Sequence, residues 1–202
     1  LEAPAPSIDF AAVEEFFGKV AADSSAGYNA VLVYIGDRLG LWRALSSVDQ
    51  ATSEQLAERS GLAERYVREW LAAQATQGYV TYDPETESFA LPSSHALVLA
   101  DEDSPAYIPP AWNVPAAMWF DENKALEAFR TGRGVAWGEH DARMSCGVAA
   151  FYRNGYRAAL VPHWLPALDG VTAQLEAGIA VADVGCGHGH STVLMAKVIL
   201  PL

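Results

Sequence analysis

The sequence predicts a mainly α-helical fold that includes a small β-hairpin and ends in the first β–α unit of an α/β domain. Three observations lead to this fold class. Apolar residues recur at helical spacing over most of the 202 residues. Two short β-prone runs, 79–82 and 88–91, flank a turn at 83–87. An apolar run at 179–184 precedes three alternating glycines and a further helical segment.

Two helices are expected at the start, after a Pro-rich stretch over residues 1–9. The first spans 10–20 and the second begins near Ala30, with a break of small residues at 23–27. Their apolar side chains exceed what a small module needs for its own core, which indicates pairing of two copies of the chain. These side chains are Phe10, Val13, Phe16, Phe17, Val31, Leu32 and Ile35.

The next segments have the order helix, helix, hairpin. Thr52 and Gln55 have the spacing of a capping box and open the first of these helices. The second runs from about 63 to 77, and Gly78 is expected to cap its C-terminus. With the helix before them and the hairpin after them, these segments have the order of a winged helix-turn-helix. We assign residues 10–103 to this domain.

Residues 104–177 are expected to form a helical connector, interrupted by Pro and Gly. Four of the six tryptophans of the chain lie in it, together with several Phe and Tyr residues. These aromatic side chains form either a helical core layer or an apolar pocket for a flat substrate. The candidate pocket residues are Trp137, Tyr152 and Tyr156.

A polar cluster in the connector suggests acid–base chemistry. His140 could remove a proton from a substrate hydroxyl, and a neighbouring carboxylate such as Glu139 would orient the imidazole. The other interpretation is an exposed polar loop with incidental charge, and both stay open. Methyl transfer to an activated acceptor needs little beyond in-line alignment, so it does not depend on this base.

The motif near the C-terminus is the most informative part of the sequence. The apolar run at 179–184 suits a buried strand, and the glycine loop and helix that follow can bring backbone N–H groups close to a ligand. A dinucleotide fingerprint would need Gly at position 190, where His190 stands, and the Lys of a P-loop is absent. The remaining pattern is Asp-x-Gly-x-Gly-x-Gly.

This pattern resembles motif I of class I S-adenosylmethionine-dependent methyltransferases. The resemblance implies that the cofactor-binding residues are Asp183, Gly185, Gly187 and Gly189. A winged helix, a helical connector and then motif I resemble small-molecule methyltransferases with an N-terminal dimerisation domain, in a bacterial branch also labelled transcriptional regulator. The resemblance implies a homodimer, S-adenosylmethionine as cofactor, and transfer to O or N of a small, partly apolar acceptor. Residues 178–202 would then open a Rossmann-like cofactor domain.

The expected cofactor domain is incomplete within the chain. An acidic residue that binds the ribose hydroxyls is expected about 20 residues beyond the first glycine, near position 205. We therefore expect a truncated form or fragment that binds the cofactor poorly and is inactive alone. The first residue is Leu rather than Met, which indicates a trimmed start.

Composition and charge exclude several other classes. With 51% hydrophobic and 19% charged residues, the chain is neither collagen-like nor disordered. The chain has a net charge of −12, and residues 49–87 contain eight acidic and three basic side chains. Both observations disfavour binding to nucleic acid. A DNA-binding regulator nevertheless remains the alternative function. No run reaches the ~18 apolar residues of a membrane helix, and two cysteines suggest a reducing compartment, so we expect a soluble, cytoplasmic protein. Cys186, His188 and His190 alternate without a companion pair, and no metal site is predicted.

Overall fold

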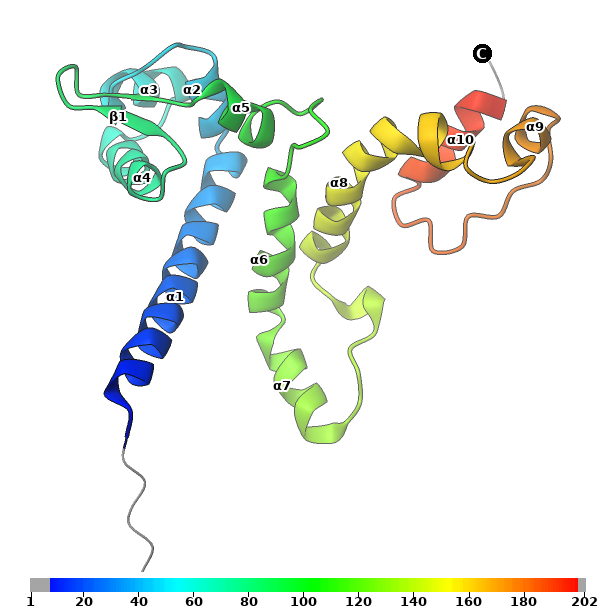
Figure 1. The fold of residues 1–202 in the computed structure, drawn as a ribbon, viewed down its shortest axis with the longest axis horizontal. Helices are drawn as coiled ribbons and strands as arrows, with labels where there is room; N and C mark the ends of the chain where they lie inside the picture. The colour runs from blue at the N-terminus through cyan, green and yellow to red at the C-terminus, as the bar shows by residue number, and fades with distance from the viewer. Residues whose placement is uncertain (1–7, 200–202) are drawn as a thin grey trace, which may run out of the picture.

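A computed structural model describes residues 8–199 of the chain. Figure 1 shows three parts in chain order: a long helix attached to a small helical domain with a hairpin, a set of connector helices, and a short C-terminal part. None of the helices described is long and apolar enough to cross a membrane.

The first helix, α1 (Phe10–Arg38), is continuous. The predicted break at 23–27 is therefore wrong. The Oγ atom of Ser24 donates to the carbonyl of Val20 at 2.9 Å, and Lys19 pairs with Asp23 at 2.6 Å, so the small and polar residues are accommodated within the helix. Small residues lower helix propensity by less than about 1 kcal/mol each, and packing of the C-terminal half outweighs this preference. Asp9 caps the N-terminus by accepting from the N–H of Ala11 at 3.0 Å.

The predicted winged helix-turn-helix is confirmed in its element order. Thr52 and Gln55 form the predicted capping box. Gly78 adopts the left-handed conformation just after the helix Glu64–Thr76. The hairpin is antiparallel and pairs Tyr82 with Phe89. Its elements are α2 (Leu41–Ser46), α3 (Ser53–Ser60), α4 (Glu64–Thr76), β1 (Thr81–Asp83) and β2 (Ser88–Ala90).

The main hydrophobic core lies in this domain, where α1 meets α2 and α4. Trp42 and Trp70 meet edge to face, with ring centroids 4.6 Å apart. Their indole N–H groups donate to the carbonyls of Val33 and Leu32, respectively, in α1. Gly36 provides the space for both rings, since a Cβ at this position would lie 2.6 Å from Trp70. The C-terminal half of α1 is thus an integral part of the domain.

The connector is helical, as predicted. In Figure 1, α6 runs alongside α1, α7 continues from α6 farther away from α1, and α8 returns toward the C-terminal part. Helix α8 packs against α6, and its Asn154 donates to the carbonyls of Glu102 and Ser104, which fastens it to the end of the winged domain. The elements are α5 (Ser93–Leu99), η1 (Pro109–Trp112), α6 (Asn113–Phe120), α7 (Glu122–Thr131), η2 (Trp137–Glu139), α8 (Ala142–Ala159), η3 (Leu160–Trp164) and α9 (Val171–Glu176).

The C-terminal part contains the glycine loop and α10 (His190–Ile199), which packs on α8 and α9. The strand expected at 179–184 is not formed, and this prediction is corrected. A strand needs a neighbour for its N–H and C=O groups, and the one sheet within residues 8–199 consists of β1 and β2. Val181 and Val184 remain exposed as a result.

Candidate functional site

The glycine loop lies directly before α10. Gly185, Gly187 and Gly189 all adopt positive φ, at 75°, 55° and 74°. A Cβ placed on any of them would meet no atom within 4 Å. The three glycines are therefore needed for the backbone conformation, and they leave open space beside the loop where a ligand can approach the main chain.

Asp183 is held at the entrance to this loop. Its Oδ2 atom accepts hydrogen bonds from the hydroxyls of Thr192 at 2.6 Å and Ser191 at 2.7 Å, in the first turn of α10. The Thr192 hydrogen bond, followed by that of Ser191, lowers the pKa of Asp183 below its usual range. Both bonds end on one oxygen, so Oδ1 is left as an oriented anionic acceptor among the residues described. An ammonium group is a suitable donor for it.

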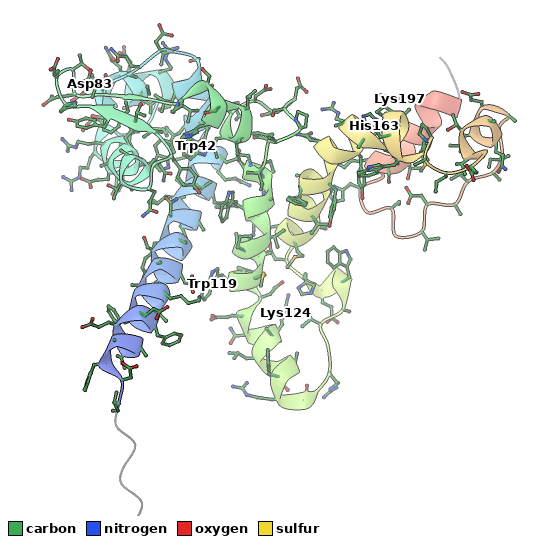
Figure 2. The ribbon with its side chains drawn as sticks, viewed as in Figure 1. Trp42, Asp83, Trp119, Lys124, His163 and Lys197 are labelled. Atoms are coloured by element: carbon green, nitrogen blue, oxygen red, sulfur yellow. The ribbon has the colours of Figure 1, made fainter. Side chains whose placement is uncertain are left out.

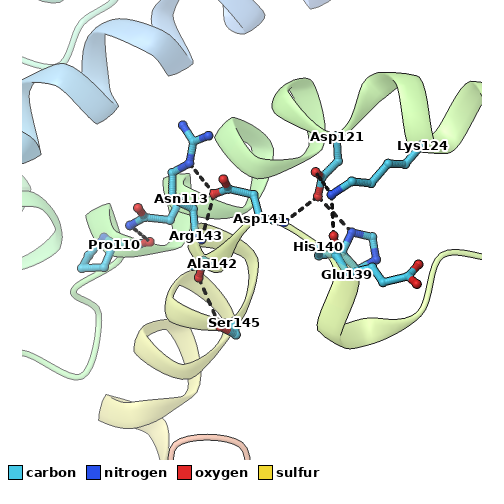
Figure 3. Close-up of polar contacts among 10 residues, drawn as sticks. All are labelled: Pro110, Asn113, Asp121, Lys124, Glu139, His140, Asp141, Ala142, Arg143 and Ser145. Carbon is cyan, nitrogen blue, oxygen red and sulfur yellow. Dashed lines mark hydrogen bonds and ion pairs between the residues drawn. The ribbon is translucent and has the colours of Figure 1, made fainter.

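A second polar cluster lies where α6, α7 and η2 meet (Figure 3). Asp121, 5% exposed, accepts a hydrogen bond from the Lys124 ammonium at 2.7 Å on Oδ1. Its Oδ2 atom accepts from the backbone N–H of Asp141 at 2.7 Å and lies 3.2 Å from Nδ1 of His140. The Lys124 bond is the main reason that the pKa of Asp121 falls to about 2, and the Asp141 N–H and His140 add to it.

Of the two predicted catalytic residues, only His140 contacts the Asp121 cluster through its side chain. His140 is 24% exposed and has Asp121 as its carboxylate partner, whereas the Glu139 side chain is exposed. It is the backbone carbonyl of Glu139 that takes part in the cluster, as an acceptor for Lys124. A role for the Glu139 carboxylate stays a prediction.

The three predicted pocket residues fall into two groups. Tyr152 and Tyr156 stack on α8 with centroids 5.8 Å apart, and Trp164 meets the Tyr156 ring edge to face. Trp137 instead packs edge to face on His140, with centroids 6.1 Å apart. Ten residues of helix separate the start of α8 from Tyr152, a rise of about 15 Å. Trp137 therefore lies beside the polar cluster of Asp121 and His140. Tyr152 and Tyr156 lie farther along α8, the helix that packs against α10.

An apolar groove of about 760 Å³ lies between α1 and the α6 region. Figure 2 shows Trp119 on the side of α6 that faces α1. Tyr28 and Tyr34 line the opposite wall, and Asp23 contributes a carboxylate. Trp119 belongs to the aromatic set of the connector, for which an apolar pocket was one of the two predicted interpretations, whereas Tyr28, Tyr34 and Asp23 were not predicted as part of a site.

Asp121 was also missed by the sequence reasoning. It is separated from His140 by 19 residues and two helical segments, so their proximity depends on how α7 turns back. A partial signal exists in the sequence, since Asp121 stands between the apolar end of α6 and the charged start of α7.

The N-terminal domain matches a protein-family model. Residues 27–101 match the model described as the Rv2258c-like winged HTH domain. The match confirms the winged helix-turn-helix predicted from the element order. No curated protein matches the sequence significantly.

Several solved structures share the fold. The mitomycin 7-O-methyltransferase MmcR is 19% identical with a TM-score of 0.61, over 94% of this chain and 57% of that one. An O-methyltransferase family protein from Burkholderia thailandensis is 17% identical with a TM-score of 0.58, over 90% and 53%. PigF, solved with SAH, is 16% identical with a TM-score of 0.56, over 89% and 55%.

These likenesses show the fold. The chain shares its fold with solved O-methyltransferases, and its N-terminal domain matches a winged HTH model, which confirms at the level of fold the resemblance inferred from the glycine motif. It spans just over half the length of these solved structures.

Proposed function

We propose that this chain is part of an S-adenosylmethionine-dependent methyltransferase that acts on an oxygen of a small, partly apolar acceptor. The observation that carries the proposal is the pairing of a free Asp183 Oδ1 with three left-handed glycines before α10. Transfer to nitrogen, the other possibility raised by the sequence, has less support because two of the structures that share the fold are named as O-methyltransferases.

The residues present fit one end of the cofactor. The Asp183 carboxylate would accept from the ammonium group of the methionine moiety, and the glycine backbone would lie along that moiety. The cofactor, when bound, supplies an electrophilic methyl group on a sulfonium. SAH, present in the PigF structure, is its demethylated product.

The acceptor would be held by aromatic side chains of the connector. Tyr152, Tyr156 and Trp164 form a connected row near α10, and their flat faces suit an aromatic or otherwise planar acceptor. Trp137 would contribute from the His140 side. This assignment follows the prediction made from the aromatic content of the connector.

A homodimer is part of the proposal. The N-terminal part of α1 (residues 10–20) exposes several large apolar side chains, and the groove between α1 and α6 continues this surface. A second copy of the chain would bury both. The exposed residues are Phe10, Val13, Phe16, Phe17 and Val20.

The described residues supply only the methionine end of a cofactor site. Within them we find no ribose-binding carboxylate beyond the glycine loop and no partner strand for residues 179–184. Absence of one charge-assisted hydrogen bond weakens binding by roughly 1.5–3 kcal/mol, or about ten- to a hundredfold. We therefore expect the 202-residue chain to bind the cofactor weakly and to transfer no methyl groups by itself.

The test is an NMR titration of the 202-residue chain with SAH, because amide shifts report weak binding. We expect shifts confined to the glycine loop and the first turn of α10. Asp183→Asn should weaken binding about ten- to a hundredfold. The control is Asp169→Asn, an exposed carboxylate outside the loop, which should bind as the native chain does. Equal binding by Asp183→Asn would refute the cofactor assignment.

A DNA-binding regulator is the second candidate, and the match to a winged HTH domain favours it. The charges of the domain oppose it. In α4, Arg65 and Arg68 are paired with Glu69 and Glu64, at 3.2 and 3.6 Å. The hairpin turn carries Asp83 and two glutamates without a base. Phosphate groups would meet neutralised arginines and a negative turn.

A further inference from the structure

A groove of about 520 Å³ lies in the winged domain, between α4 and the β1–β2 hairpin, and the first turn of α3 contributes to its wall. We call it the wing groove. Its volume is within the range of about 300–1,000 Å³ that small-molecule pockets occupy. Figure 1 shows α3, α4 and β1 at the opposite end of the molecule from α10. The wing groove is therefore separate from the glycine loop, and the proposed methyl transfer does not use it.

Small side chains on α4 create the space of the wing groove. Ala72 and Ala75 line it, and their three-residue spacing places both methyl groups on one face of the helix. The hairpin wall is aromatic, since Phe89 is buried there, Tyr82 is 48% exposed, and the centroids of the two rings are 4.8 Å apart. Methyl groups on α4 and a half-exposed phenol ring on the hairpin suit a flat apolar body.

The charged groups of the wing groove carry an excess of negative charge. Glu54, Glu87 and Arg68 line it. The Nε atom of Arg68 lies 3.6 Å from the Glu64 carboxylate, whose Oε1 atom also accepts from the Ser53 hydroxyl at 2.7 Å. This arginine is thus already paired, whereas neither Glu54 nor Glu87 has an ion-pair partner within residues 8–199. An anionic occupant would meet two unpaired carboxylates, and a cation would neutralise them.

We propose that the wing groove binds an organic cation with an aromatic body, of the arylalkylammonium class. The ring would lie between the methyl groups of α4 and Tyr82, and the ammonium group would pair with Glu54 and Glu87. A cation close to the tyrosine ring gains a further attraction from the ring quadrupole. The surface that a winged helix would present to DNA thus carries the charge and the hollow for a small cation instead of a phosphate backbone.

Tryptamine and indole-3-propionate are the probes, because they share an indole ring and carry opposite charges at neutral pH. Amide ¹H–¹⁵N spectra of the 202-residue chain are recorded with each probe at up to ~10 mM, a concentration that reveals weak binding. We expect tryptamine to shift amides of the hairpin and of α4 between Arg68 and Thr76, and indole-3-propionate to leave them unchanged. Equal shifts with both probes, absence of shifts in the groove with tryptamine, or shifts confined to α1, α6 or α8 would overturn the proposal.

The charged contacts are tested by a double substitution. Glu54→Gln/Glu87→Gln should weaken the binding of tryptamine about tenfold, because both charge pairs are lost. The matched control is Glu85→Gln, in the same hairpin turn but outside the groove lining, which should bind as the native chain does. Native affinity in the double variant would show that the carboxylates do not hold the ammonium group, and the proposal would fail.

The space beside α4 is tested by Ala72→Leu. Residue 72 is exposed and leucine is a good helix former, so this variant should fold. The larger side chain should fill the groove and abolish the shifts that tryptamine causes there. Ala72→Ser, which leaves the space open, should retain binding. Binding by Ala72→Leu with native affinity would place tryptamine outside the groove and overturn the proposal.

Discussion

Gly36 shows how one missing side chain determines the packing of the winged domain. A Cβ at this position would lie 2.6 Å from Cζ2 of Trp70 and 2.9 Å from Nε1 of Trp42. Both atoms belong to rigid rings whose N–H groups are bound to the backbone of α1. Neither ring can move without loss of a hydrogen bond, so the glycine is required by space and not by backbone conformation.

We predict that Gly36→Ala destabilises the protein by about 1–2 kcal/mol. Overpacking of a core costs about 1–3 kcal/mol, which exceeds the ~0.5–1 kcal/mol that alanine contributes over glycine in a helix. Urea unfolding followed by tryptophan fluorescence measures the difference. The matched control is Gly18→Ala, in the same helix with nothing within 4 Å of its Cβ, which should be stabilising by about 0.5–1 kcal/mol. Equal effects of the two substitutions would contradict the packing role of Gly36.

The Asp121 carboxylate should make stability depend on pH in acid. Its pKa of about 2 lies below the ordinary value of 3.8 because Lys124, the Asp141 N–H and His140 donate to the ionised form. The folded state therefore binds this proton less readily than the unfolded state, and the stabilisation is complete above pH ~4. It is lost as the pH falls toward 2. We expect the gap in unfolding free energy between the native chain and Asp121→Asn to narrow from pH 5 to pH 2. A gap that stays constant over this range would show that the cluster does not form.

The α4 helix and the β1–β2 hairpin are the elements that a winged helix would present to DNA. Figure 2 places Asp83 at the outer end of the hairpin, where its carboxylate accepts from Glu85 and Thr86 and remains ionised. The two arginines of α4 form i,i+4 pairs with glutamates. Neither element offers a free cation to a phosphate group.

We predict no specific binding to duplex DNA at about 150 mM salt. An electrophoretic mobility assay with a random duplex library measures it. As a control for the assay, replacing Asp83, Glu85 and Glu87 by lysine should produce weak, salt-sensitive binding without sequence preference. A saturable, sequence-dependent footprint by the native chain would instead favour the regulator function.

The elements differ in how well local sequence predicts them. The capping box at Thr52 and the hairpin could be predicted because their signals are local, a side chain three residues from its backbone partner and two β-prone runs beside a turn. Two predictions were wrong for non-local reasons. The small residues at 23–27 remain helical because the C-terminal half of α1 is packed in the winged domain. Residues 179–184 form no strand because the described residues 8–199 offer no neighbouring strand to pair with them.

The candidate site divides in the same way. Asp183 and its glycines are contiguous in the sequence, so their motif could be found without a structure. The partner of His140 could not be found, because carboxylates adjoin it on both sides in the sequence, Glu139 and Asp141, whereas the carboxylate that contacts the imidazole is Asp121. The division of the aromatic residues between Trp137 and Tyr152 likewise depends on the length of α8.

The exposed N-terminal part of α1, residues 10–20, leads to a prediction of the oligomeric state. Phe16 and Phe17 are 66% and 73% exposed there, an arrangement that is unfavourable for a monomer. We predict a homodimer at micromolar concentration, so that sedimentation equilibrium gives twice the chain mass of 21.7 kDa. Replacing both residues by aspartate should yield a monomer, because the charges would be buried in the interface.

The matched control is Phe129→Asp. Phe129 is 92% exposed on α7, outside the apolar part of α1, and its replacement should leave the dimer intact. A native chain that sediments at 21.7 kDa under these conditions would contradict the dimer. Dissociation by Phe129→Asp would move the interface to α7.

The continuity of α1 couples two regions that differ in how often they open. Asn29, Val33 and Gly36 are buried in the winged domain, so amide protons near them exchange with solvent only when that domain unfolds. Residues 10–20 make few buried contacts, and their amides exchange through fraying of the helix end. Because the two halves share one helix without a hinge, an event that suppresses fraying at the exposed end also extends hydrogen-exchange protection inward, one turn after another, toward the tryptophan core.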